Sequence, residues 1–195
     1  MKRNSDPAEA GCADGVVALP ARGPWCVAAT LATLRIHAIP GMESAGPGRC
    51  EHTRVVMDGG EPRIIRVRLE TDGVRFRAVD GASTSPAMLD LVRRWFDLDA
   101  DTERIDAKLG AEGLLTQDVH DRPGVRLVGY VDDFEAVAAT VLGQQVSLAA
   151  GRRLLGRLVA AYGTPVGAGF RAFPTARRVA GEDCNRLRET IGLTR

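Results

Sequence analysis

The sequence predicts an α+β protein in which a small antiparallel sheet with flanking helices precedes a helical unit. Residues 52–78 form short segments rich in Val and Ile that alternate apolar and polar side chains, the period of half-buried strands. Residues 134–162 instead repeat apolar side chains at the spacing of a helix face. We expect a flexible lead-in over residues 1–23, an α+β domain over 24–115 and a helical domain over 116–195.

Composition narrows the class of protein. The 195 residues are 45% hydrophobic and 26% charged, which is ordinary for a soluble globular protein. The net charge is only +1, so any nucleic-acid surface must be a local patch. No apolar run approaches the roughly 20 residues that cross a bilayer, and residues 1–15 lack the apolar block of a signal peptide. We therefore expect a cytoplasmic protein.

Neither a metal nor a cofactor is expected. Cys12, Cys26, Cys50 and Cys184 are scattered, without a CxxC pair or a nearby histidine, so they indicate neither a disulfide framework nor a zinc site. The sequence also contains no phosphate loop of the GxxxxGK[ST] type.

The first helix is predicted over residues 25–39, an apolar run that Pro40 and Gly41 end. Its His37 is more typical of a packed or half-exposed histidine than of a metal ligand.

Hairpin turns then separate the predicted strands, at residues 58–60 and 71–73, where glycine supplies the positive φ of tight turns. Buried positions alternate along these strands with a set of arginines: Arg66, Arg68, Arg75 and Arg77. The outer face of the sheet therefore carries positive charge and either faces DNA or is simply solvated. The interspersed acids Glu70, Asp72 and Asp80 favour the solvated face.

A helix follows the strands, with Ser85 as its cap and Pro86 at its first position, where the missing N–H costs nothing. Its apolar stripe predicts that it packs on the sheet; the stripe comprises Met88, Leu89, Val92, Trp95 and Phe96. In the charged stretch 99–115, the spacing of Ile105 and Leu109 predicts a short helix held against the body.

Two amphipathic helices meet at a polar corner in the C-terminal part. Asp132 and Asp133 offer a capping side chain before the first helix, and the second begins at about Ser147. Between them lie Gly143 and the pair Gln144-Gln145. Such a corner presents backbone amides and amide side chains to a partner.

Residues 122–151, RPGVRLVGYVDDFEAVAATVLGQQVSLAAG, resemble the start of the helical domain of the alkylated-base DNA glycosylases, the 3-methyladenine glycosylase II or AlkA type of the helix-hairpin-helix superfamily. LRIHAIPGME at residues 34–43, RWFDL at 94–98 and FPT at 173–175 lie in the order and spacing of that family. The resemblance covers about residues 20–195 and is most specific in LGQQVS. It implies a TBP-like α+β unit followed by an all-helical domain.

The resemblance also implies a function for the polar corner. Enzymes of this family extrude a damaged base from double-stranded DNA and hold the gap open with a side chain wedged into the minor groove. It implies that Gln145 is the wedge and that Gln144 lies beside the flipped nucleotide. The implied DNA-binding residues are Gly143, Gln144, Gln145, Val146 and Ser147. Without the resemblance, the two glutamines would be ordinary helix-start residues.

The sequence departs from the family where the chemistry is carried out. The family continues with a helix-hairpin-helix and a catalytic Asp, but the 195 residues contain no LPGxG-like hairpin and end at about the point where the next helix should begin. Asp132, Asp133 and Asp183 stand at helix starts and are interpreted as caps, so no catalytic residue is assigned. Lys108 lies between the domains and matches no lyase nucleophile.

Two further departures bear on the handling of substrate. Thr33 stands where the family usually carries an aromatic residue, and Ala139 lies near the place of a basic one.

Three hypotheses remain open. The chain is a fragment of a base-excision repair glycosylase that is inactive alone, with the apolar faces of Leu155, Leu158 and Val159 partly uncovered. Alternatively, it is one half of a split glycosylase, completed by a chain that carries the hairpin and the catalytic Asp. The third hypothesis is a non-catalytic DNA-binding or regulatory module.

Overall fold

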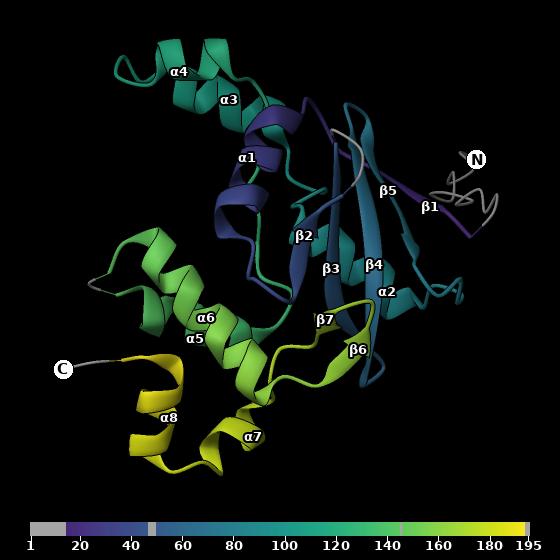
Figure 1. Ribbon diagram of the computed structural model, residues 1–195. Helices are drawn as coiled ribbons and strands as arrows, with labels where there is room; N and C mark the ends of the chain where they lie inside the picture. The colour runs from purple at the N-terminus through teal and green to yellow at the C-terminus, as the bar shows by residue number, and fades with distance from the viewer. Residues whose placement is uncertain (1–14, 47–49, 145, 194–195) are drawn as a thin grey trace, which may run out of the picture.

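The protein is an α+β structure built on a five-stranded antiparallel sheet (Figure 1), as the sequence predicts. The computed structural model describes residues 15–46, 50–144 and 146–193. The strand order is β1-β5-β4-β3-β2. The strands are β1 (Val17–Pro20), β2 (Glu43–Ala45), β3 (Glu51–Asp58), β4 (Glu61–Glu70) and β5 (Gly73–Ala78).

Helices flank the sheet and form most of the C-terminal half of the chain. They are α1 (Val27–His37), α2 (Pro86–Trp95), α3 (Thr102–Gly110), α4 (Thr116–Asp121), α5 (Asp133–Gly143), α6 (Leu148–Tyr162), α7 (Ala176–Ala180) and α8 (Cys184–Ile191). A two-stranded hairpin of β6 (Pro165–Gly167) and β7 (Phe170–Arg171) interrupts this helical part. Within the described ranges, no helix is long and apolar enough to cross a membrane.

The main core lies between the sheet and α2. Alternate residues of β4 and β5, among them Val67 and Phe76, are buried and meet Val92 and Trp95 of the helix. Ser85 caps α2 as predicted, because its Oγ accepts the N–H of Met88 at 3.1 Å. The tight turn between β3 and β4 is also confirmed, since Gly59 and Gly60 both have positive φ angles, 61° and 91°.

The predicted lead-in over residues 1–23 is wrong for residues 17–20, which form β1 and pair antiparallel with β5. Val17 and Leu19 point into the core from this strand. Four residues are too few to show a clear alternation, so the partner strand specifies β1 rather than its own sequence. Residues 1–14 lie outside the described part of the chain.

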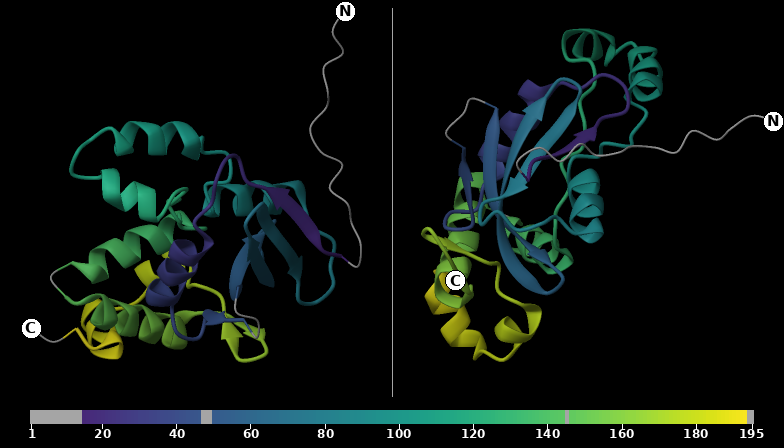
Figure 2. Two further views of the ribbon diagram at one scale, coloured as in Figure 1. Left: turned by 90° about the horizontal axis from the view of Figure 1, so that it is seen from above. Right: turned by 90° about the vertical axis from the view of Figure 1, so that its right-hand side faces the viewer.

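The contact predicted for Ile105 and Leu109 is wrong. Both side chains of α3 stay 41% exposed, because α3 packs chiefly on its neighbour α4 and leaves the body as a helical pair (Figure 2). Polar contacts attach the pair at its base, where Asp106 accepts the N–H of Gly124 at 2.7 Å. These two helices lie on either side of the predicted domain boundary between residues 115 and 116, whereas the domain limits themselves stay a prediction.

The apolar faces expected to be uncovered on α6 are covered. Leu155, Leu158 and Val159 are all buried. Ile39 and Met42 share a core cluster with Leu155 and Val159. Ile191 of α8 packs beside Leu158. The core of the helical part is therefore covered and is shared with residues of the α+β unit. Exposed apolar residues lie elsewhere, among them Val137 and Val141 of α5.

We predict that Leu69→Ala lowers the free energy of unfolding by about 2 to 5 kcal/mol, because it opens a cavity in the sheet core, where Leu69 is buried. The matched control is Leu114→Ala, whose side chain is 96% exposed and which should change stability by less than about 0.5 kcal/mol. Chemical denaturation of the two variants measures both values. Equal effects would contradict the assignment of the core.

Candidate functional site

The corner between α5 and α6 is exposed, and a cap fixes it on the side of α6. At the end of α5 that is far from the corner, the Oδ1 atom of Asp132 accepts the N–H of Glu135 at 2.8 Å. At the start of α6, Ser147 Oγ accepts the N–H of Ala150 at 3.3 Å. The two helices can approach closely because Gly151 has no side chain. A Cβ atom at this position would lie only 3.4 Å from the Cα of Gly143.

The structure places the predicted DNA-facing residues together at this corner. Gly143, Gln144, Val146 and Ser147 are all exposed to solvent. Gln145, the predicted wedge, lies outside the described residues. The corner thus has the exposure that its predicted function requires, while contact with DNA stays a prediction.

A cavity of about 440 Å³ reaches from the corner toward the sheet. Gly143 and Val146 line it on the side of the corner. The remaining walls come from α1, β2, β3, the end of α2, the segment 128–130, α5 and α6. Its polar lining consists of Thr33, His37, Glu43, Arg54, Tyr130, Glu135 and Arg152. A volume of this size falls in the range of small-ligand sites.

A buried ionic cluster in the lining of this cavity joins the sheet to α5. Arg54 Nη2 lies 2.7 Å from Glu135 Oε2, and Arg54 Nη1 lies 3.7 Å from Glu43 Oε1. His52 Nε2 lies 2.9 Å from Glu43 Oε2. All four side chains are at most 6% exposed. The guanidinium of Arg54 also lies over the ring of Trp95, 5.0 Å from its centroid.

The two carboxyl groups of the cluster titrate differently. Burial raises the pKa of Glu135 to about 7. The positive charge of Arg54 opposes this rise, and the negative charge of Glu43 adds to it. Burial would also raise the pKa of Glu43, but Arg54 and the hydrogen bond with His52 bring it below its usual value. Burial and the two nearby carboxylates raise the pKa of the Tyr130 hydroxyl. The cavity therefore has one carboxyl group that titrates near neutral pH.

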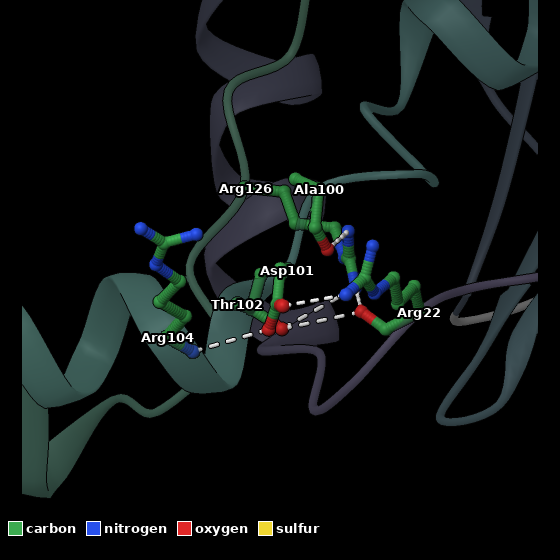
Figure 3. Close-up of polar contacts among 6 residues, drawn as sticks. All are labelled: Arg22, Ala100, Asp101, Thr102, Arg104 and Arg126. Carbon is green, nitrogen blue, oxygen red and sulfur yellow. Dashed lines mark hydrogen bonds and ion pairs between the residues drawn. The ribbon is translucent and has the colours of Figure 1, made fainter.

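A second arginine fixes the segment that leads to α5. Arg126 is buried and donates from Nη1 to the carbonyl of Asp97 at 2.5 Å and from Nη2 to the carbonyl of Arg22. Thr102 Oγ1 donates to the carbonyl of Pro24 at 2.8 Å. It also lies 3.3 Å from the carbonyl of Arg22, beside Arg126 (Figure 3). Further along, the N–H of Gly129 donates to the carbonyl of Trp95 at 2.8 Å. These contacts hold residues 126–130 against the α+β unit and bring Tyr130 to the cavity.

The two positions at which the sequence is expected to depart from the family that it resembles both line this cavity. Thr33 lies in its wall, with its hydroxyl donating to the carbonyl of Ala29 at 3.1 Å, and Ala139 lines it from α5. Two of the three acids interpreted as caps are confirmed: Asp132 caps α5 and Asp183 caps α8. Asp133 is the first residue of α5.

Sequence analysis missed the cluster itself. Arg54 and Glu135 are 81 positions apart, and each stands in an ordinary strand or helix pattern. The sequence did carry a signal for Arg54. The alternation of β3 places this residue on the inward face, where a charged side chain needs a buried partner. Within the described ranges, no group of three or more His, Cys, Asp or Glu residues could hold a metal ion.

Comparison with known proteins identifies relatives of this chain. Residues 16–132 match the model of the AlkA N-terminal domain. The chain is 36% identical over 175 residues to a probable bifunctional transcriptional activator/DNA repair enzyme AlkA of Mycobacterium tuberculosis. This match covers 87% of this chain and 35% of that protein. It is 35% identical over 97 residues to DNA-3-methyladenine glycosylase 2 of Escherichia coli, covering 49% of this chain and 32% of the relative. The chain thus spans about a third of the length of these curated relatives.

Solved structures share the fold. The 3-methyladenine DNA-glycosylase from Archaeoglobus fulgidus superposes with a TM-score of 0.72 at 16% identity, covering 91% of this chain and 62% of that one. MBOgg1 in complex with a low affinity DNA ligand gives a TM-score of 0.70 at 18% identity, covering 99% of this chain and 62% of that one. Both neighbours thus match the α+β unit together with most of the helical part.

We predict that Glu135 makes the stability of the chain pH-dependent. Between pH 4.5 and about 7 the folded chain keeps a proton that the unfolded chain has lost, so the contribution of Glu135 to the free energy of unfolding falls as the pH rises through this window. Glu135→Gln should remove this slope. Denaturation across the window measures it, and Glu61→Gln, at an exposed strand position, is the control that should keep it. Parallel profiles for the wild type and Glu135→Gln would contradict the assignment.

Proposed function

Because the chain belongs to the AlkA N-terminal domain family of DNA glycosylase and repair proteins, we propose that it takes part in the base-excision repair of alkylated DNA. Double-stranded DNA that contains alkylated bases is its proposed partner, and the cytoplasm is its proposed compartment. The carrying observation is the exposed α5–α6 corner, two of whose residues, Gly143 and Val146, line the 440 Å³ cavity.

In this proposal the corner probes the duplex and the cavity receives the extruded base. Gln145 enters the minor groove and fills the vacated stack, where its amide can hydrogen-bond the orphaned base. Gln144 lies beside the flipped nucleotide. Gly143, Val146 and Ser147 provide the close backbone approach and the start of α6.

The proposed base pocket combines apolar walls with few polar groups, as ligand sites usually do. Trp95, Leu155 and Val128 supply apolar surface, while the half-exposed Tyr130 offers a hydroxyl donor. Thr33 leaves more room in the wall than an aromatic side chain would. This supports a pocket shaped differently from that of relatives with an aromatic residue in α1.

We propose that the 195 residues bind DNA without excising the base. The candidate acids have other functions: Asp132 and Asp183 cap helices, and Glu43 and Glu135 belong to the buried cluster. A complementary chain that carries the hairpin and the catalytic Asp would make the chain half of a split glycosylase. Its landing surface would include Val137 and Val141, which are 59% and 58% exposed.

The alternative is a non-catalytic DNA-binding or regulatory module. It is favoured by the relative that is described as both a transcriptional activator and a DNA repair enzyme. Both alternatives use the same corner, and they differ in whether a second chain restores base release.

We predict that the purified chain alone releases neither 3-methyladenine nor 7-methylguanine from alkylated DNA, because Glu43 and Glu135 in the cavity pair with Arg54, and Asp132 and Asp183 cap helices. Chromatography of the released bases provides the measurement. Release above background that disappears on changing an Asp of this chain would overturn the proposal.

We also predict weak, salt-sensitive binding to duplex DNA, since few phosphate contacts are available at the corner. The double variant Gln144→Ala, Gln145→Ala should lose affinity for a duplex with an unpaired base, whereas Gln117→Ala, on exposed α4, should not. Fluorescence anisotropy over a salt series tests both points. Tight binding that persists at high salt would count against the proposed interface.

A further inference from the structure

The outer face of β4 and β5 carries arginines that the proposed interface does not use. We propose that this face is a second DNA-contact surface, which holds the phosphate backbone of a duplex. The inference rests on the proposed function, because it takes DNA as the partner. It concerns Arg66, Arg68, Arg75 and Arg77, called here the arginine face.

The register of the sheet puts like charges directly opposite each other. Arg66 pairs with Arg77, and Arg68 pairs with Arg75, across the β4–β5 ladder. Opposed side chains on one face of a sheet lie about 4.5–5.5 Å apart at Cβ, and like charges at this spacing destabilise the sheet. An anion bound over the face would relieve this repulsion.

The neighbouring acids neutralise only part of this charge. Glu70 Oε2 lies 2.6 Å from Arg75 Nε, and Glu70 Oε1 lies 3.5 Å from Arg68 Nε. Asp80, which the sequence suggested as a counter-charge, pairs instead with Arg63 at 3.2 Å.

Arg66 and Arg77 are therefore left without an ion pair in the part of the chain that the structure describes. The sequence favours a solvated face on which acids balance the arginines. Arg68 and Arg75 fit this interpretation, but Arg66 and Arg77 do not.

Within the described ranges, most of the arginine face is exposed to solvent. Helix α2 covers the opposite side of the sheet, and the β6–β7 hairpin crosses the outer side toward the other end of the strands (Figure 2). Val55 and Ile64 lie under that hairpin, beyond the arginines. The side chains of Arg68 and Arg75 are 64% and 46% exposed. Arg77 is exposed as well, whereas Arg66 is half-buried and its Nε has no hydrogen-bond partner among the described residues.

The chemistry of the face fits phosphate. A guanidinium presents a planar fork of donors that matches phosphate oxygens, and alternate residues of a strand repeat about every 6.6–6.8 Å. Along β4 and β5 the arginines thus form a regular array of positive charge, suited to a row of phosphates.

An acidic polypeptide is the competing partner, and the surroundings of the arginines disfavour it. Stable protein interfaces need buried aromatic or aliphatic anchors at their centre. Here the cross-strand neighbours on the same face are Thr53 beside Arg66 and Ala18 beside Arg75. A surface of short side chains and guanidinium groups instead matches the polar, positively charged character of protein–DNA interfaces.

The test measures the salt dependence of binding to an undamaged duplex several helical turns long. The variant Arg66→Gln, Arg77→Gln should lower the slope of log K against log salt by about 0.9 for each lost phosphate contact, about 1.8 in all. The variant Arg66→Lys, Arg77→Lys should keep most of the wild-type slope. The charge-matched control is Arg122→Gln, Arg186→Gln, two exposed arginines on other elements that are already paired with acids. An unchanged slope in the first variant, or an equal fall in the control, would overturn the proposal.

Two further readouts separate this proposal from its alternatives. Removing the opposed charges should leave the melting temperature unchanged or raise it, so a marked fall would show that the arginines are structural and overturn the inference. Loss of binding to polyglutamate with unchanged DNA binding would assign the face to an acidic polypeptide instead. A wild-type chain that binds no duplex at any salt concentration refutes the proposed function as well. Normal dependence on Gln144 and Gln145 with an unchanged slope refutes only the arginine face.

Discussion

The buried pair of Arg54 and Glu135 is the interaction on which the arrangement of the two halves depends. It joins the middle of β3 to the first turn of α5, and α5 ends at the polar corner. Burying either charge away from water is costly unless the opposite charge stays paired with it. The position of α5 on the sheet is therefore narrowly specified. The same pair helps to line the cavity, which means that the element that orients the corner also shapes the proposed pocket.

Arg126 complements this arrangement by a different principle. Its hydrogen bonds go chiefly to backbone carbonyls, so it fixes mainly the path of the chain. The segment that enters α5 is thus held before the helix begins. A rigid support of this kind is what a DNA-probing corner requires, because an exposed loop gains precision only from the scaffold that presents it.

Local chemistry made much of the fold predictable. The Ser85 cap, the glycine turn at residues 59–60 and the alternation of β4 depend on neighbours in sequence, and all three are confirmed. The ionic cluster could not be predicted in this way, since Arg54 meets its partner only after the sheet and α5 have docked. Ile105 and Leu109 show the converse limit: a correct apolar spacing predicted a helix but not what that helix packs against.

Strand β1 has a consequence for handling the protein. Its four residues cover the edge of β5, so they close a side of the sheet that would otherwise present unpaired N–H and C=O groups. An N-terminal deletion that removes residues 17–20 leaves a bare edge strand, with part of the core exposed beside it. Such an edge invites strand pairing between molecules, and the expected outcome is aggregation rather than a smaller folded domain.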